Sequence, residues 1–192
     1  MSKMTTINRE FSQYASKLAK LLENYNWVEV ERLVASLHRI WLQRDKLFIC
    51  GNGGSAANAA HIANDFLYGI GAGKVPGMNV EALTSNLAVL TCLANDVGYE
   101  SIFSCQLEAK GKPADLLIVL SGSGNSLNVV AALEVAKTIG METWAIVGYD
   151  GGECAKLADN SIHVAVEDMQ ISEDFQSIIA HMCMQSLKKR IT

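Results

Sequence analysis

The sequence has few charged residues: only 19% of its 192 residues are Asp, Glu, Lys or Arg, while 49% are apolar. Because an average soluble domain has about 25% charged residues, this apolar excess suggests that some surface is buried between subunits. The formal net charge is −4, and Lys and Arg are scattered apart from Lys188-Lys189-Arg190. The chain therefore lacks the basic excess of nucleic-acid-binding proteins, and nucleic acid is not an expected ligand.

Long apolar runs are also missing. No window reaches the roughly 18 apolar residues of a membrane span, and the polar first residues lack the apolar stretch of a signal peptide. The five cysteines are widely spaced and form neither a Cys-x-x-Cys pair nor a zinc-finger pattern with histidines. We expect a cytoplasmic protein with no membrane segment and with reduced, mostly buried thiols.

Two stretches with helical spacing of apolar residues come first, Thr6 to Glu23 and Trp27 to Gln43. They predict a helical hairpin ahead of the first strand. Short apolar runs then alternate with helix-length segments, a pattern typical of a parallel sheet covered by helices on both faces. The five predicted strands are Lys46–Cys50, Met78–Leu83, Asp115–Leu120, Glu142–Val147 and Ser161–Ala165.

The chain has the length of one domain, and no linker, repeat or low-complexity tract divides it. The expected fold is a single three-layer α/β/α domain over residues 1–192. Residues 1–44 form the N-terminal helices, and residues 45–192 form the α/β core with its five-stranded parallel sheet. The last segment, Ser172 to Arg190, is predicted to be a closing helix with Ser172 as its N-cap.

Two loops rich in glycine and serine follow predicted strands and lead into predicted helices. Loop one is Gly51-Asn-Gly-Gly-Ser-Ala56, and loop two is Ser121-Gly-Ser-Gly-Asn-Ser126. Glycines let the backbone approach a ligand, and the N-terminus of the following helix attracts an anion. Both loops lie at the carboxyl ends of parallel strands, where ligands of open α/β folds bind. A single glycine loop is often only a turn, but two loops of matched chemistry favour a phosphate ester.

Loop one also fits Gly-x-Gly-x-x-Ala, a dinucleotide-binding pattern. The acidic residue expected about 20 positions further on is missing, because Glu81 lies further away and inside a predicted strand. A Walker A loop is excluded because no Gly-Lys-Ser/Thr occurs. A phosphorylated sugar accounts for both loops, whereas NAD accounts for only one. We therefore expect a small phosphorylated sugar as the ligand and no nucleotide cofactor.

Four segments of the chain form a recognisable set: CGNGGSAANAAHIANDF, LANDVGYESIF, LSGSGNSLNVV and EDFQSIIAHM. Together they resemble the sugar isomerase (SIS) fold, and in particular the phosphoheptose isomerases, which convert sedoheptulose 7-phosphate to heptose 7-phosphate. The resemblance extends over nearly the whole chain and implies a homotetramer with active sites at subunit interfaces. The substrate site that it implies is lined by Asn52, Gly53, Gly54, Ser55, Asn95, Asp96, Ser121, Gly122, Ser123, Ser126 and Gln176.

The resemblance also implies a zinc site and an acid–base pair. The implied ligands are a histidine, a glutamate four residues later, a glutamine, and a second histidine eight residues after that glutamine. His61 and Gln176 match this pattern, Asp65 replaces the glutamate, and Met184 stands at the second histidine. His61 and Asp65 are four residues apart and share one face of a predicted helix. His61, Asp65 and Gln176 are therefore the expected catalytic residues and zinc ligands.

The two replacements alter the expected chemistry. Asp65 withdraws its carboxylate by one methylene, roughly 1.3–1.5 Å, where about 1 Å of misplacement can cost ~10²-fold in rate. Met184 cannot transfer a proton and is a poor zinc ligand. His181 is five residues from Gln176, roughly 140° around the helix, so we expect it to face elsewhere and to serve packing or an interface.

These observations leave two interpretations open. The first is an aldose–ketose isomerase acting on sedoheptulose 7-phosphate or a related sugar phosphate, with weakened or redirected turnover. Such an enzyme needs a base near C1 and C2 and an acid or metal to stabilise oxygen charge. The second is a non-catalytic tetrameric SIS protein that binds or regulates, of the kind that associates with a replication initiator.

Overall fold

The computed structural model describes the backbone of residues 3–71 and 73–190 and the side chains from residue 8 onward. Its centre is a five-stranded sheet with the order β2-β1-β3-β4-β5, and every neighbouring pair of strands is parallel. This confirms the predicted parallel sheet, with strand ends shifted by one or two residues. The strands are β1 (Lys46–Gly51), β2 (Asn79–Ala82), β3 (Leu116–Ser121), β4 (Glu142–Val147) and β5 (Asn160–His163).

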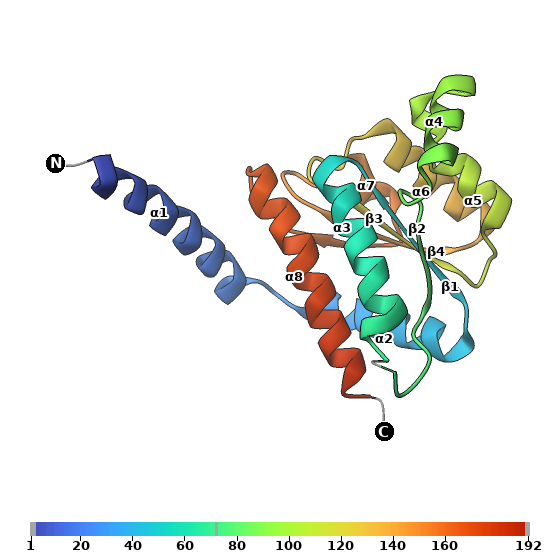
Figure 1. Ribbon diagram of the computed structural model, residues 1–192, viewed down its shortest axis with the longest axis horizontal. Helices are drawn as coiled ribbons and strands as arrows, with labels where there is room; N and C mark the ends of the chain where they lie inside the picture. The colour runs from blue at the N-terminus through green and yellow to red at the C-terminus, as the bar shows by residue number, and fades with distance from the viewer. Residues whose placement is uncertain (1–2, 72, 191–192) are drawn as a thin grey trace.

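Helices cover both faces of the sheet, which gives the three predicted layers (Figure 1). One face packs against α2 (Val28–Gln43), α3 (Gly53–Asn64) and α8 (Met169–Lys188). The other face packs against α5 (Ser104–Lys110), α6 (Leu127–Ile139) and α7 (Gly152–Leu157). Successive residues of a strand point to opposite faces, so the unbroken apolar run of β3 supplies both cores.

The strand order places the first and third strands side by side. The chain passes from β1 through α3 to β2 on one side, and from β3 through α6 to β4 on the other. The pairing extends to Gly51 and Leu120, so the two strands end together. The strand order reverses at this point, and ligands of open parallel sheets bind at such a switch point, beyond the carboxyl ends of the strands.

The N-terminal helices form where they are predicted, but they do not form a hairpin. Figure 1 shows α1 (Lys3–Asn24) projecting from the body instead of folding back along α2. Its second half is joined to α8, because Tyr14 donates a hydrogen bond to Asp174 (2.5 Å) and Lys17 pairs with Asp168 (2.8 Å). The bond to Asp174 raises the pKa of Tyr14 to about 12. An apolar stripe predicts a helix face to be covered, but it does not say by which surface.

The closing helix α8 begins earlier than predicted. Asp168 is its N-cap, and the Asp168 side chain accepts a hydrogen bond from the backbone N–H of Ile171 (3.2 Å). Ser172, the predicted N-cap, lies in the first turn and donates its hydroxyl to the Asp168 carbonyl (2.8 Å). The prediction was wrong because Asp168 and Ser172 are both good capping residues. Ile171 is buried in the core, so the helix already includes it and starts after Asp168.

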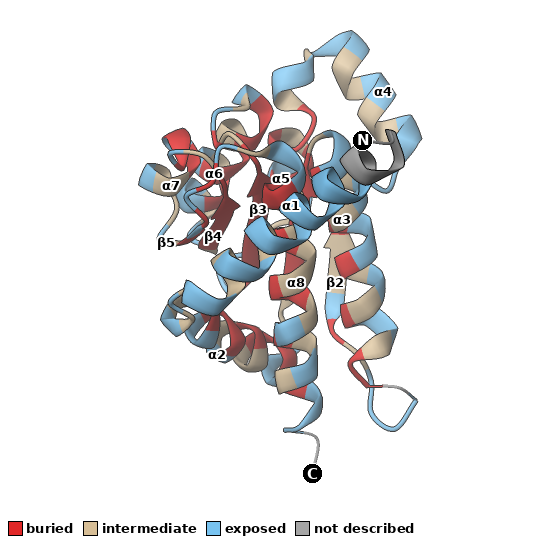
Figure 2. Cartoon of the chain, turned by 90° about the vertical axis from the view of Figure 1, so that its left-hand side faces the viewer, coloured by how far each residue is buried: buried red, intermediate tan, exposed pale blue. Residues whose placement is uncertain are grey.

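Three shorter helical segments lie between β1 and α5. The helix α3 continues into a π-helical turn, η1 (Asp65–Gly69), while α4 (Leu87–Asp96) and the 3₁₀ turn η2 (Tyr99–Ser101) lie between β2 and α5. No residue of α4 is buried, and Figure 2 shows it standing out from the body.

The cysteines are free thiols, and three of the five, Cys50, Cys154 and Cys183, are buried. Burial raises the pKa of Cys154 and of Cys183 to about 12. Across the part of the chain that the structure describes, no helix is both long enough and apolar enough to pass through a bilayer.

Candidate active site

Loop one turns directly from β1 into α3, whose first residue is Gly53. Gly53 has a φ of 55°, a left-handed conformation that favours glycine. At Gly51 a Cβ would lie only 2.7 Å from the Leu120 carbonyl oxygen, so the close approach of β1 to β3 also requires glycine. The twelve-residue helix α3 thus begins at the carboxyl end of β1, and the free N–H groups of its first turn suit an anion.

Loop two is a compact turn built by its own serines. The Ser121 hydroxyl oxygen accepts a hydrogen bond from the Gly124 N–H (3.0 Å), and the Ser123 hydroxyl oxygen accepts one from the Asn125 N–H (3.3 Å). A hydroxyl that accepts in this way keeps its own O–H for a ligand. Ser126 is the N-cap of α6, and its side chain makes no capping bond. Loop two thus offers three hydroxyl donors at the start of a helix.

An amide pair joins loop one to the helix that follows loop two. The side chains of Asn52 and Asn128 exchange two hydrogen bonds of 2.8 Å each, and Tyr99 donates a third, of 3.0 Å, to the Asn52 oxygen. Asn128 is buried in the second position of α6. The sequence analysis did not single out Asn128 or Tyr99, although both lie inside the motifs that carry the resemblance. Their contacts fix the distance between the loops.

Replacing Asn128 with alanine is expected to lower the free energy of unfolding by about 1–3 kcal/mol, because the Asn52 amide loses both of its reciprocal bonds. The same change should raise the KM for a sugar phosphate more than it lowers kcat, since loop spacing serves binding. Urea denaturation and steady-state kinetics measure the two effects. Asn79→Ala, at an exposed position of β2, should change stability by no more than about 0.5 kcal/mol.

A cavity of about 240 Å³ lies beside loop one, between that loop and the segment from α4 to η2. Its walls include Asn52 and Gly53 from the loop and Thr91, Ala94 and Tyr99 from the opposite side. The predicted substrate residues Asn95 and Asp96 are exposed and do not line this cavity. Asn95 instead donates to Asp96 (2.7 Å). Among the described residues, the side-chain hydrogen bonds of Asn95 and Asp96 are to each other and to Cys92, and none reaches loop one or loop two.

Gln176 lies behind loop one and is almost completely buried, with 1% of its surface exposed. Its Nε2 donates to the Ser55 hydroxyl (3.0 Å), and its Oε1 accepts from the Asn58 amide (3.0 Å). Both ends of the side chain are therefore occupied within the described chain. Gln176 braces the first turns of α3 from α8, next to the predicted substrate site.

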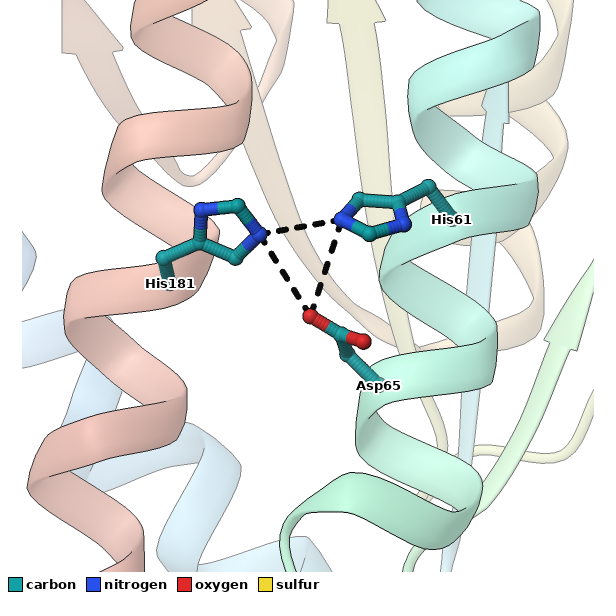
Figure 3. Close-up of side chains that lie close together, drawn as sticks. All are labelled: His61, Asp65 and His181. Carbon is teal, nitrogen blue, oxygen red and sulfur yellow. Dashed lines mark hydrogen bonds and ion pairs between the residues drawn. The ribbon is translucent and has the colours of Figure 1, made fainter.

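His61, Asp65 and His181 form a cluster where α3 and α8 lie side by side (Figure 3). The Nε2 atoms of the two imidazoles are 2.9 Å apart. Asp65 Oδ2 lies 3.7 Å from Nε2 of His61 and 3.5 Å from Nε2 of His181. The histidines are about half exposed, and Asp65 is more buried. Two ring nitrogens and one carboxylate oxygen thus converge at a partly open position.

The prediction that His181 faces elsewhere was wrong. At roughly 100° per residue, Glu173 and Met184 lie between Gln176 and His181 on the circumference of α8. Glu173 faces α3 and Met184 faces the η1 turn that continues it, because these side chains are the nearest neighbours of Gly54 and Gly69. Gln176 and His181 therefore lie on opposite flanks of one contact stripe, each roughly 60–80° from its centre. Gln176 is on the buried flank, and His181 reaches His61 from the exposed flank.

Comparison with known proteins shows which family has this fold and these motifs. The family model described as the SIS domain matches residues 10–148. A phosphoheptose isomerase from Helicobacter pylori (strain P12) is 36% identical over 186 residues, which are 95% of this chain and 94% of that protein. One from Akkermansia muciniphila is 40% identical over 149 residues, 77% of each chain. This chain belongs to the phosphoheptose isomerase family of SIS-domain proteins.

The fold agrees with that family. The structure of a phosphoheptose isomerase from Neisseria gonorrhoeae superposes with a TM-score of 0.87 and 25% identity, over 98% of this chain and 100% of that one. The resemblance based on the four sequence segments is confirmed, and so is the SIS fold.

The donor set of this phosphoheptose isomerase family member suits zinc. Zinc in catalytic sites takes three protein ligands from imidazole nitrogens, carboxylates or thiolates and leaves one position open. The ligand atoms of His61, Asp65 and His181 all lie within 4.8 Å of one another. Met184 lies one turn beyond His181, beside Gly69 and near Asp65, and its thioether is a poor zinc ligand. The residues present fit the metal: His61 and Asp65 are two of the predicted ligands, and His181 supplies a third ligand atom beside them.

Proposed function

We propose that this protein is an aldose–ketose isomerase of sugar phosphates, acting on sedoheptulose 7-phosphate or a close relative. The relatives that match nearly the whole chain are named phosphoheptose isomerases, which supports this substrate class. The observation that carries the proposal is the pair of hydrogen bonds between Asn52 of loop one and Asn128, in the helix that follows loop two, at the carboxyl edge of the sheet. A single glycine turn would not need this connection, whereas a site that holds a phosphate and a sugar from two loops does.

In the proposed mechanism, loop two binds the phosphate. The hydroxyls of Ser121, Ser123 and Ser126 donate to its oxygens, and the N-terminus of α6 stabilises its charge. Loop one and Ser55 position the sugar chain, with Gln176 holding the Ser55 hydroxyl in place. Asn95 and Asp96 complete the proposed substrate site by contacting a substrate held partly by a second subunit.

We also propose that His61, Asp65 and His181 hold a zinc ion. When bound, zinc would supply a Lewis acid for the negative charge that develops on the sugar oxygens. The three side chains already converge, so little rearrangement of α3 and α8 is needed to receive it. Gln176 contributes by bracing the helix that carries His61 and Asp65.

A homotetramer in the cytoplasm is part of the same proposal. The free cysteines support a reducing compartment. Apolar residues exposed on the single chain support assembly, since Phe11 on the projecting helix α1 and Leu87 at the start of α4 are 68% and 72% exposed. Charged substitution at α1, Phe11→Glu with Tyr14→Glu, is expected to lower the molar mass in sedimentation equilibrium. A wild-type monomer would contradict the tetramer.

The test of the proposed function is turnover. Purified protein is incubated with sedoheptulose 7-phosphate, and the aldose product is followed by NMR before and after zinc is removed with a chelator. We expect turnover that falls on chelation and returns with added zinc. No turnover in any of these conditions, with tight sugar-phosphate binding, would overturn the isomerase proposal.

One observation favours a second candidate function. Met184 stands where the resemblance expects an acid–base histidine, as in a protein that keeps the fold and the loops but not the chemistry. Such a protein would be a tetrameric binding partner, for example of a replication initiator. Recovery of an initiator on the immobilised protein, together with no turnover and no sugar-phosphate affinity, would favour this candidate.

A further inference from the structure

Glu173 lies at the start of α8, directly over the first turn of α3. Its carboxylate occupies the space that a Cβ on residue 54 would fill, so any side chain at that position would collide with it. Gly54 belongs to loop one and to the proposed substrate site. The glycine thus leaves room for a carboxylate beside the backbone that is proposed to hold the sugar.

Two contacts fix the backbone under Glu173. The carbonyl oxygen of Glu173 accepts a hydrogen bond from the Asn58 side chain (3.0 Å), and one turn later Gln176 donates to Ser55 (3.0 Å). Both partners lie in the first two turns of α3. The position of Glu173 relative to loop one is therefore set by the contact between the two helices.

The Glu173 carboxylate also has free oxygens. Among the described residues it takes part in no hydrogen bond or ion pair, whereas the neighbouring acids Asp168 and Asp174 are bound to Lys17 and Tyr14. The first N–H groups of α3 attract negative charge at this place. A carboxylate that is held in position but has no protein partner is available to a ligand.

The other acid of the site is already engaged. Asp65 lies within 3.7 Å of two imidazole nitrogens, and its carboxylate is one methylene shorter than the glutamate of the resemblance. Met184 can neither accept nor donate a proton. An isomerase built on this chain therefore needs a base from elsewhere, and Glu173 is the unpaired carboxylate at loop one.

We propose that Glu173 is the catalytic base of the isomerisation, an assignment that rests on the proposed function. Its carboxylate accepts a proton from C1 of the ketose. The electron pair of the broken C–H bond forms C1=C2, and the oxygen on C2 takes the negative charge. The carboxyl group then returns the proton to C2, the hydroxyl proton on O1 moves to O2, and C1 becomes the aldehyde. No oxidant or reductant is consumed.

Glu173→Gln tests this assignment, because it keeps the shape of the side chain but cannot accept the proton. General acid–base groups contribute about 10²–10⁴-fold, so kcat should fall by at least about 100-fold. Exchange of the substrate C1 hydrogen with deuterated solvent should fall equally, while the Kd for the sugar phosphate, the zinc content and the thermal midpoint stay unchanged. Glu173→Asp should retain part of the activity. Asp174→Asn is the matched control, since its carboxylate is bound by Tyr14.

The outcomes separate the two proposals. Wild-type turnover together with Glu173→Gln turnover within threefold of it would overturn the assignment and leave the isomerase proposal standing. A Glu173→Gln loss that is matched by lost zinc, lost sugar-phosphate affinity or a lowered thermal midpoint would also overturn it. Wild-type protein without turnover or deuterium exchange would contradict the proposed function itself, and the assignment with it.

Discussion

Replacing His181 with alanine is expected to weaken zinc binding by more than about 100-fold. The cluster offers three ligand atoms, and the change removes one of its two ring nitrogens. Loss of a group that only orients a ligand costs about 10–100-fold in metal affinity, so loss of a ligand itself should exceed that range. Competition with a chromophoric chelator measures the affinity, and turnover with sedoheptulose 7-phosphate should fall with it.

The matched control for this change is Met184→Ala, on the next turn of the same helix. Met184 lies beside Asp65 but contributes no ring nitrogen or carboxylate, so zinc affinity should stay within about threefold of the wild type. If His181→Ala kept its zinc while Gln176→Ala lost it, the ligand set would be His61, Asp65 and Gln176, as the sequence alone predicts.

Leu37→Ala is expected to give the largest loss of stability, about 2–5 kcal/mol. Leu37 is 0% exposed in α2, where it packs in the core between that helix and the sheet. Truncation removes buried apolar surface and leaves a cavity that a close-packed interior fills only in part. Since each kcal/mol shifts the midpoint of a domain of this size by about 2–4 °C, the thermal midpoint should fall by roughly 4–20 °C.

Leu42→Ala is the control, because it makes the same change in helix propensity without removing a buried side chain. Leu42 lies in the same helix, one turn nearer its end, and is 70% exposed. The same chemical change there should alter the free energy of unfolding by no more than about 0.5 kcal/mol. Equal losses for the two variants in urea denaturation would show that the α2 face assigned to the core is wrong.

The sheet and its loops could be predicted because each signal is local. A run such as Leu116 to Leu120 is long enough for a strand and too short for a helix, and the serines and glycines that follow it end the strand in a turn. The structure places both loops at the carboxyl edge, as the parallel arrangement requires. Resemblance then supplied the family, and the comparisons confirmed it.

The cluster at His181 could not be predicted, because it depends on how two helices meet. The angle of roughly 140° between Gln176 and His181 around α8 predicts that the two side chains lie on different faces of the helix. The contact stripe of α8 is centred between them, so residues on both flanks reach α3. The same limit applies to α1, whose apolar residues predict a covered face but do not name its partner. Asn95 and Asp96 likewise carry a family motif, yet among the described residues they make no hydrogen bond to either loop of their own chain.

The most direct test of the proposed site is a crystal structure of the protein with zinc and a sugar phosphate bound. We predict anomalous zinc density between Nε2 of His61, Nε2 of His181 and Oδ2 of Asp65, with the phosphate on Ser121, Ser123 and Ser126. The C1–C2 end of the sugar should lie next to the Glu173 carboxylate. Phosphate density away from loop two, or zinc held by Gln176 with His181 turned away, would contradict it.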